Sequence, residues 1–458
     1  MSATEYIGVR KITGPFVLLD GIQGAGYDEI VLVSTPDGEA RKGRVVLVDE
    51  KATLVQVFTG TEGLVPETTS VRFLGRELEM ALAPSMLGRT FSGLGEPRDG
   101  YGPVLGGVRR PVRGAPINPM AREYPRNFIS TGISSLDVLL TLIRGQKLPI
   151  FSGNGLPHNA LAVQIATQSK LLGAENFVVV FAGIGIKNDD AAYFQSHLAS
   201  EGRGGNLVLF LNLADDPVIE RIATPRLALT TAEYLAFDLG MHVLVILTDM
   251  TSYCEALREL SVARGEVPSR KGYPAYLYSD LASLYERAGA LRNSKGSVTQ
   301  IPILSMPNDD ITHPVPDLTG FITEGQIVLS RDLEARGIYP PVDVLPSLSR
   351  LMKDGIGKGS TREDHANLAG QLFASYSRVQ EVRALAGVVG TDELSRADKA
   401  SLAFGDSFER LFVNQGMEEN REIGHSLDLG WKLLSMLPVQ ELSRLSMEEI
   451  EKYIKKRA

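Results

Sequence analysis

The chain has 458 residues, 43% of them hydrophobic and 22% charged, and its 47 basic and 55 acidic residues give a net charge of −8. This length predicts two or three domains, and the composition is typical of a globular protein. No long basic run occurs, so we expect no nucleic-acid partner. The apolar runs are shorter than the roughly 20 residues that cross a membrane, so we expect no direct membrane insertion. Cys254 is the only cysteine, which excludes an intrachain disulfide and favours a reducing, cytoplasmic compartment.

Residues 1–75 predict a small N-terminal β-barrel. The apolar segments 30–35 and 43–48 flank Pro36-Asp37-Gly38, a strong hairpin signal, and segment 53–58 alternates as a further strand. Short strands at this spacing are typical of a barrel or sandwich. We expect this domain to serve stability or assembly rather than ligand binding.

Residues 76–145 are rich in Gly and Pro, which predicts a connector built from turns. From residue 146 to about 330, strand-like and helix-like segments alternate, which predicts a parallel sheet covered by helices. The expected strands are 148–151, 177–182, 207–211 and 242–247, and the expected helices are 159–172, 188–200 and 225–239.

The last of these helices has clear boundary signals. Thr224 can act as its cap, Pro225 occupies the first helical position, and Gly240 can close the end. The segment 340–350 then leads out of the central domain.

Residues 152–159 connect the first strand of this domain to its first helix, which is the context of phosphate-binding loops. The residues that bear on nucleotide binding here are Ser152, Gly153, Asn154, Gly155, Pro157, His158 and Asn159.

The phosphate-loop pattern requires glycine, lysine and a hydroxyl residue where this chain has Pro157, His158 and Asn159. Proline has no backbone N–H, histidine with a pKa of about 6.5 is mostly neutral at neutral pH, and asparagine has no hydroxyl for magnesium. The sequence therefore predicts a degenerate loop, either a purely structural turn or a site of weak nucleotide binding.

Asp249 follows the fourth expected strand at its carboxyl end, where phosphate-loop enzymes position magnesium. The residue has two interpretations, a vestigial magnesium position and a turn or cap former. The six histidines have no metal-ligand spacing and lack a second cysteine, so we expect no metal cage.

Residues 351–458 have a helical pattern. One apolar helical face consists of Phe404, Phe408, Leu411 and Phe412, and a second cluster consists of Trp431, Leu433, Leu434 and Leu437. We assign both to core packing, and the charged end at 449–458 to a solvated helix. The sequence thus predicts an α/β multidomain protein divided into an N-terminal β-barrel (1–75), a central phosphate-loop-NTPase-like parallel α/β domain with a degenerate loop (76–350) and a C-terminal α-helical domain (351–458).

Several stretches together resemble the B subunits of the V-type and A-type rotary ATPases. They are 145–158, 212–217, 220–226, 240–249, 295–304, 317–327 and 340–350. Within the last, Pro340-Pro-Val-Asp-x-x-x-Ser347-x-Ser349 is similar to the signature of the α/β-type chains of rotary ATPases. The resemblance covers essentially the whole chain.

This resemblance implies a non-catalytic, regulatory chain that alternates with a catalytic A subunit in an A3B3 ring, with central and peripheral stalk subunits as further partners. Such a ring is the soluble head of a membrane complex that couples ATP hydrolysis or synthesis to H+ or Na+ transport. ATP or ADP with Mg is then expected at the interface with the A subunit rather than bound tightly by this chain.

The resemblance also implies roles for particular residues. Arg350 matches the arginine that reaches the neighbouring catalytic site in trans, where a guanidinium stabilises charge on the phosphoryl group. Ile184 stands where related catalytic chains place a water-polarising glutamate. As residues of the subunit interface we expect Tyr278, Arg264, Ser347 and Ser349.

Two other functions use a similar core. A free-standing nucleotide hydrolase requires an intact lysine loop, which is absent here. A ring-shaped nucleic-acid motor requires a basic RNA-binding front domain, whereas residues 1–75 are mixed in charge. We therefore expect enzymatic activity only within a complex, and none from the chain alone.

Overall fold

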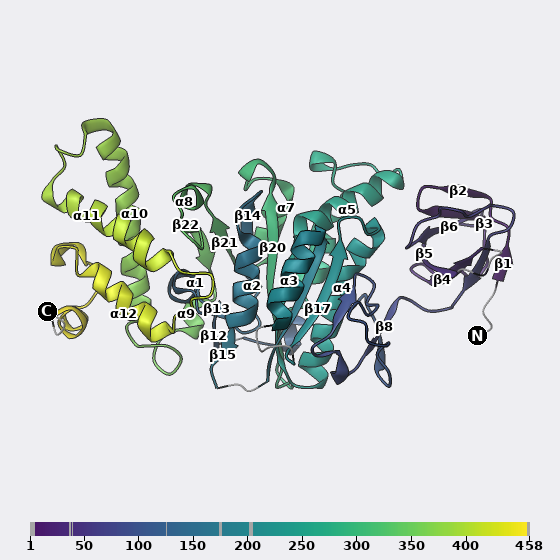
Figure 1. Cartoon of the computed structure of the whole chain (residues 1–458), viewed down its shortest axis with the longest axis horizontal. Helices are drawn as coiled ribbons and strands as arrows, with labels where there is room; N and C mark the ends of the chain where they lie inside the picture. Colours follow the sequence, from purple (N-terminus) through teal and green to yellow (C-terminus); the bar gives the residue numbers. More distant parts are fainter. Residues whose placement is uncertain are drawn as a thin grey trace.

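In the computed structural model the chain folds into three parts that follow one another along its long axis (Figure 1). The structure describes residues 5–35, 38, 40–124, 126–173, 176–200 and 205–455. A β part and a helical part lie at opposite ends, with an α/β part between them. Of the expected hairpin turn, Pro36 and Asp37 lie outside the described residues, and so do residues 456–458 of the expected C-terminal helix end.

The N-terminal part is a seven-stranded antiparallel sheet in the order β1-β7-β4-β5-β6-β3-β2, which curls into a barrel (Figure 1). Its strands are β1 (Glu5–Ile7), β2 (Lys11–Thr13), β3 (Phe16–Asp20), β4 (Ile30–Ser34), β5 (Ala40–Val48), β6 (Ala52–Val57) and β7 (Ser70–Phe73). Strands β4 and β5 pair as the hairpin signal predicts. The barrel core is rich in valine, whose branched side chain packs well on a pleated surface.

The central part is built on a ten-stranded sheet whose main path runs β22-β21-β14-β20-β18-β16-β17-β9. These strands are β9 (Thr90–Ser92), β14 (Ile150–Gly153), β16 (Phe177–Ile186), β17 (Leu207–Leu213), β18 (His242–Thr248), β20 (Ser297–Met306), β21 (Gly325–Leu329) and β22 (Val342–Ser349). All neighbours on this path are parallel except β21 and β22. The four strands expected from apolar runs are all present.

Helices cover both faces of this sheet (Figure 1). They are α2 (His158–Gln168), α3 (Asn188–Ser200), α4 (Val218–Glu233), α5 (Met250–Ala263), α6 (Leu277–Tyr285), α7 (Pro314–Ile322) and α8 (Arg331–Ala335). Along β16, Val179 and Phe181 pack in one buried cluster with α2 and α3, whereas Val178 and Val180 pack in another with α4 and α5. Because both faces are buried, the strand is apolar throughout.

The prediction that residues 76–145 form a connector built from turns is wrong in part, because short strands and a helix lie among the turns. Strand β9 from this segment pairs with β17 at the edge of the central sheet. The segment also holds β8 (Glu79–Leu82), β10 (Val108–Pro111), β11 (Arg122–Glu123), β12 (Phe128–Ser130), α1 (Ser134–Leu139) and β13 (Leu142–Ile143). These elements are short and several pair with distant strands, namely β11 with β19 (Gly289–Leu291) and β12 with β15 (Lys170–Leu171), so they leave no local periodicity.

The predicted start of the third helix at Pro225 is also wrong. Helix α4 begins at Val218, and Pro225 lies inside it. Thr224 does not cap the helix, because its Oγ1 donates to the Glu220 carbonyl at 2.7 Å. Burial of Ile219 and neighbouring side chains favours an earlier start, although the proline cannot donate a helical hydrogen bond. Gly240, with φ +71°, does follow the end of the helical segment as predicted.

The C-terminal part is helical. It contains α9 (Met352–Gly355), α10 (His365–Val389), α11 (Arg396–Ser407), a π-helical segment (Phe408–Val413), α12 (Ile423–Leu434) and α13 (Met447–Ile450). The rings of Phe404, Phe408 and Phe412 stack in the core as predicted, but Leu411 is 48% exposed because the wider π turn rotates it outward. Trp431 and its neighbouring leucines are buried as predicted. Among the described residues, no helix combines the length and apolar character that a membrane crossing demands.

Candidate functional site

The side chains of the degenerate loop are used within the chain. Ser152, buried at the end of β14, has its Oγ 3.0 Å from Nδ1 of His158. Asn159 donates from Nδ2 to Oδ1 of Asp190 on α3 at 3.0 Å. The residues at the lysine and hydroxyl positions of a phosphate loop therefore bind neighbouring elements of this chain.

The backbone of the loop also folds back on itself. The Leu156 N–H donates to the Gly153 carbonyl at 3.2 Å, and the His158 N–H donates to the Leu156 carbonyl at 2.8 Å. Pro157 between them has no N–H. A phosphate-binding loop instead directs successive N–H groups at the anion. This conformation removes donors that a nucleotide phosphate would need.

An ion pair covers the start of the loop. Arg331 donates from Nε and Nη2 to the two carboxylate oxygens of Asp309 at 2.8 and 2.9 Å, and from Nη2 to the Asn154 carbonyl at 3.0 Å. These hydrogen bonds from Arg331 lower the pKa of the Asp309 carboxyl. A Cβ at position 153 would lie 2.1 Å from the Asp309 carboxylate, so Gly153 is the residue that fits below the pair. Asp309 and Arg331 were not predicted from the sequence, because neither belongs to a recognisable motif.

Asp249 lies at the carboxyl end of β18, as predicted, after a cis peptide bond with Thr248. Its Oδ1 accepts hydrogen bonds from the backbone N–H groups of Thr251 at 2.7 Å and Ser305 at 3.1 Å. The bond from Thr251 caps helix α5 and supports the cap interpretation, and the bond from Ser305 ties Asp249 to β20. The magnesium position stays a prediction. Ile184 is fully buried in the apolar core, so the position expected for a catalytic glutamate holds no carboxylate.

Arg350 follows the last residue of β22 and is exposed. Its backbone N–H donates to the Glu324 carbonyl at 3.0 Å, which fixes the main chain. Its Nη1 donates to the Thr323 carbonyl at 3.5 Å, a long and weak bond. Among the described residues, the guanidinium makes no ion pair. The backbone of Arg350 is therefore fixed, while its guanidinium is free to bind a group outside this chain.

A polar cluster lies beside the backbone of Arg350. It consists of the buried residues Gln146, Lys147 and Ser349 and the partly exposed Glu324. Gln146 donates from Nε2 to the Glu324 carbonyl at 3.2 Å and to Oγ of Ser349 at 3.0 Å. Lys147, with 4% of its side chain exposed, forms ion pairs with Glu324 at 2.9 Å and Glu286 at 2.7 Å. Apart from Ser349, these residues were not predicted as site residues from the sequence, because their contacts join segments about 180 residues apart.

Ser347 and Ser349, two expected interface residues, are buried in β22. Ser347 accepts from the Val328 N–H at 2.9 Å, and Ser349 donates to the Thr141 carbonyl at 2.9 Å. Within this chain both hydroxyls hold β22 in place beside β21 and the preceding segment. Their interface role stays a prediction.

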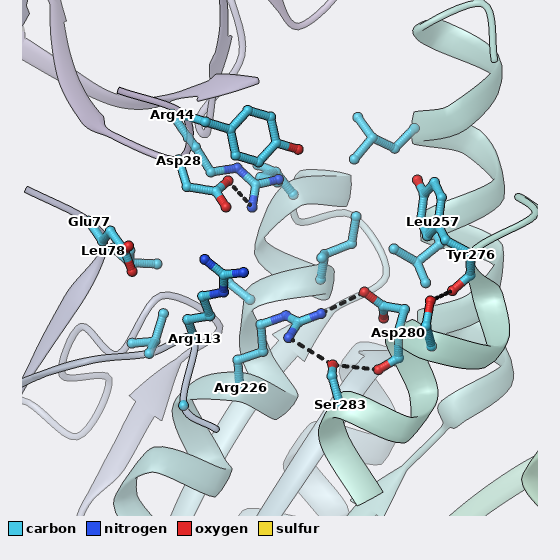
Figure 2. A pocket seen from close by; sticks show the side chains of 18 of the residues that line it. Asp28, Arg44, Glu77, Leu78, Arg113, Arg226, Leu257, Tyr276, Asp280 and Ser283 are labelled. Atoms are coloured by element: carbon cyan, nitrogen blue, oxygen red, sulfur yellow. Dashed lines mark hydrogen bonds and ion pairs between the residues drawn. The ribbon is translucent and has the colours of Figure 1, made fainter. Parts of the chain in front are cut away.

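Arg264 and Tyr278 lie elsewhere. Arg264, at the end of α5, pairs with Glu266 at 3.6 Å and lines a cavity of about 530 Å³. This cavity lies between the barrel and the α/β domain (Figure 2). Tyr278 lies on α6 and is 50% exposed. In the part of the chain that the structure describes, no hydrogen bond or ion pair joins either residue to Arg350. The structure therefore does not bring the predicted site residues into one cluster.

Three family models match the chain along its length. Residues 9–75 match the beta-barrel domain of the ATP synthase alpha/beta family, and residues 132–349 match the nucleotide-binding domain of that family. Residues 354–454 match the C-terminal domain of V and A type ATP synthase.

Individual relatives agree with these matches. The chain is 62% identical to the V-type ATP synthase beta chain of Thermotoga neapolitana, over 99% of both chains. It is 57% identical to the B subunit of the A-type ATP synthase of Aeropyrum pernix, over 99% of this chain and 98% of that one. The solved ATP synthase subunit NeqB from Nanoarcheaum equitans is 41% identical with a TM-score of 0.74, and the match covers 93% of this chain and all of that one. The chain therefore belongs to the ATP synthase alpha/beta family, and within it to the beta or B subunits of the V-type and A-type ATP synthases.

Proposed function

We propose that this chain is the non-catalytic, regulatory B subunit of a rotary ATP synthase and that it contributes Arg350 to the catalytic site of a neighbouring A subunit. The two chains alternate in an A3B3 ring with central and peripheral stalk subunits. The complex couples ATP hydrolysis or synthesis to transport of H+ or Na+ across a membrane. The names of the relatives, which are ATP synthase beta chains and B subunits, support membership of such a complex.

The observation that carries the proposed role of Arg350 is the contrast between its backbone and its side chain. The backbone is fixed by a 3.0 Å hydrogen bond, whereas the exposed guanidinium has one bond of 3.5 Å to its own chain. A guanidinium held in this way can donate to the phosphate oxygens of a nucleotide bound to an adjacent chain, without first breaking an ion pair. Charge on the transferring phosphoryl group is then stabilised by an arginine in trans, an effect of about 10³–10⁵ in rate.

The residues of the degenerate loop do not fit a catalytic magnesium nucleotide. The loop has no lysine and no hydroxyl residue at the required positions, and the Asp309–Arg331 ion pair covers it. We therefore assign no chemical step to this loop and expect ATP or ADP with Mg on the loop of the A subunit. A free-standing hydrolase activity has no support from these residues.

The proposed role is tested by ATP turnover of rings assembled from this chain and its catalytic partner. We expect Arg350→Ala to lower turnover by about 10³-fold or more, and Arg350→Lys to recover little of it, because a lysine lacks the planar fork of donors. Lys353→Ala removes an exposed cation three residues away and is the matched control, which we expect to leave turnover unchanged. Native mass measurement checks that each ring assembles. Wild-type turnover in an assembled Arg350→Ala ring would refute the role.

A further inference from the structure

The cavity between the barrel and the α/β domain is lined by four arginines from different elements, of which Figure 2 labels Arg44, Arg113 and Arg226. Arg44 comes from β5, Arg226 from α4, and Arg264 from the end of α5, while Arg113 follows β10. In Figure 2, the side chains of Arg44, Arg113 and Arg226 approach the same space from three sides. This cavity shares no residue with the degenerate loop or with Arg350.

Three of these arginines lack hydrogen-bond acceptors within the described residues. Arg44 lies 3.6 Å from Asp28 and Arg264 lies 3.6 Å from Glu266, yet neither guanidinium donates a hydrogen bond. Their side chains are only 23% and 16% exposed, and the Nε atom of each is buried without a partner. Arg113 is exposed and has neither an ion pair nor a hydrogen bond in the described part of the chain.

Unused donors of this kind are costly when buried. A guanidinium carries five N–H donors, and a buried polar group without a partner destabilises by about 1–3 kcal/mol. Arg226 differs from the other three, because Asp280 at 2.7 Å and Tyr253 at 3.2 Å accept from it. The cavity therefore combines one satisfied arginine, two largely buried arginines whose Nε atoms lack a partner, and the exposed Arg113.

The charges around Arg44 also favour a bound anion. Burial lowers the pKa of Arg44, Asp28 opposes this shift, and the positive charges of Arg264 and Arg226 lower the pKa further. A bound anion would relieve this repulsion. The lining also includes four carboxylates, so its distinguishing property is the unused donors rather than net positive charge.

The remaining walls are apolar or aromatic. They include Tyr27, Phe58, Leu78, Leu257 and Tyr276. The cavity volume of about 530 Å³ lies within the range of roughly 300–1,000 Å³ found for small-molecule sites, which typically join an apolar lining to a few polar groups. An oxyanion alone would leave these apolar walls without contacts.

We propose that this cavity binds a phosphorylated small molecule, with its phosphate on Arg44, Arg113 and Arg264 and its organic part against the aromatic and aliphatic walls. The phosphate oxygens supply the acceptors that these guanidinium groups lack. Arginine suits such a site because its planar fork matches phosphate geometry.

The test is isothermal titration calorimetry on the full chain with two probes, pyrophosphate and ADP, in the absence of magnesium. We expect both probes to bind, and ADP to bind more tightly because its adenosine part reaches the apolar walls. Arg113→Gln and Arg44→Gln should each weaken binding by about tenfold or more, the scale of one lost charge-assisted hydrogen bond. Arg113 is exposed, so its variant should fold even where the Arg44 variant does not.

Arg109→Gln is the matched control, because Arg109 is an exposed arginine on the nearby strand β10 that does not line the cavity. We expect its affinity for both probes to equal that of the wild type. The proposal would be overturned if neither probe binds the wild type. It would also be overturned if Arg113→Gln and Arg44→Gln both bind the probes as tightly as the wild type does. Equal affinity for pyrophosphate and ADP would refute the role given to the apolar walls. The readout does not involve ring turnover, so it is independent of the role of Arg350.

Discussion

At the scale of single residues, Arg350 has its backbone fixed and its guanidinium exposed. The sequence signature predicted that this arginine has a functional role. It did not predict that the guanidinium is free of ion pairs among the described residues of its own chain. Availability depends on what surrounds the side chain, and those neighbours, Thr323 and Glu324, are about 27 residues away in the chain. The sequence therefore supplied the candidate and the structure supplied the physical reason.

In the degenerate loop, too, some features were predictable from the sequence and others were not. The chemistry missing at Pro157, His158 and Asn159 is a property of the residue types, so the sequence alone predicted it. The ion pair over Gly153 was not predicted, because Arg331 reaches the loop from 177 residues away. Ser347 and Ser349 were expected at an interface, yet their hydroxyls bond to their own chain, and a sequence motif does not reveal which way a strand residue points.

Glu409 provides a residue-scale prediction about stability. Its side chain is 3% exposed, and it accepts hydrogen bonds from Arg383 and Tyr376 at 2.7 Å and from Arg336 at 2.7 Å. Burial raises the pKa of this carboxyl, but the hydrogen bonds from the two arginines and the tyrosine outweigh burial and bring the pKa to about 2. We expect Glu409→Gln to lower the unfolding free energy near pH 7 by an amount on the order of 3 kcal/mol.

The sign of the pH dependence follows from the lowered pKa. Because the folded-state pKa lies below the unfolded value of 4.5, the stabilisation is present above about pH 4.5 and is lost as the pH falls toward 2. Denaturant unfolding followed by the fluorescence of Trp431, the only tryptophan, measures this in the same helical domain. The wild type should lose more stability than Glu409→Gln across that pH window. Parallel curves for the two proteins would contradict the assignment.

At the scale of elements, the long apolar strands β16, β17 and β18 were predicted because burial on both faces makes them apolar throughout. Strands β20, β21 and β22 were not recognised as strands, since β20 includes polar residues and a proline and β21 and β22 pair antiparallel at the sheet edge. The start of α4 was misplaced because a proline in the first turn and a proline in a packed helix look alike in sequence.

The element that presents Arg350 is the pair β21 and β22. Gly325, with φ +132°, lies where β21 passes so close to β22 that a Cβ would be 2.0 Å from the Leu348 carbonyl. Directly before it, Glu324 accepts the Arg350 N–H and binds Lys147 through its carboxylate. This close approach and the buried lysine fix the end of β22 relative to the central sheet.

Lys147→Met is the corresponding prediction. It removes the ammonium group that forms the ion pair with Glu324. The backbone at Glu324 and Arg350 should therefore shift, while the Arg350 guanidinium is still present. We expect ring turnover to fall by about 10–100-fold through kcat with little change in KM, since small misplacements of a catalytic group cost that much. Steady-state kinetics of the assembled ring measure both constants.

A double variant separates positioning from general loss of structure. If Lys147 acts through Arg350, then Lys147→Met should add little to the loss already caused by Arg350→Ala. Multiplicative losses in the double variant would mean that Lys147 supports the ring in another way. Unfolding curves of the separate chains show whether the lysine variant still folds.

At the scale of the whole molecule, the order of barrel, α/β domain and helical domain was predicted from composition and periodicity, and the family models confirm these three domain types. The boundaries at residues 75 and 350 remain a proposal. The cavity between barrel and α/β domain was not predicted, because its arginines come from segments spread over more than 200 residues. Surfaces formed between domains leave no local pattern in a sequence.

In the proposed function, the chain assists catalysis on a neighbouring subunit. Its own loop lacks the residues that bind a magnesium nucleotide, and its exposed arginine is expected to act on the neighbouring subunit. Such an arginine should stabilise the transition state more than the bound substrate.

The most direct test is a single-turnover experiment on assembled rings, wild type and Arg350→Ala, that measures ATP affinity and the rate constant of ATP cleavage separately. We predict that the variant ring cleaves bound ATP about 10³-fold more slowly or worse, while its ATP affinity changes by less than about tenfold. An unchanged cleavage rate constant in an intact variant ring would contradict the central claim that Arg350 completes the catalytic site of its neighbour.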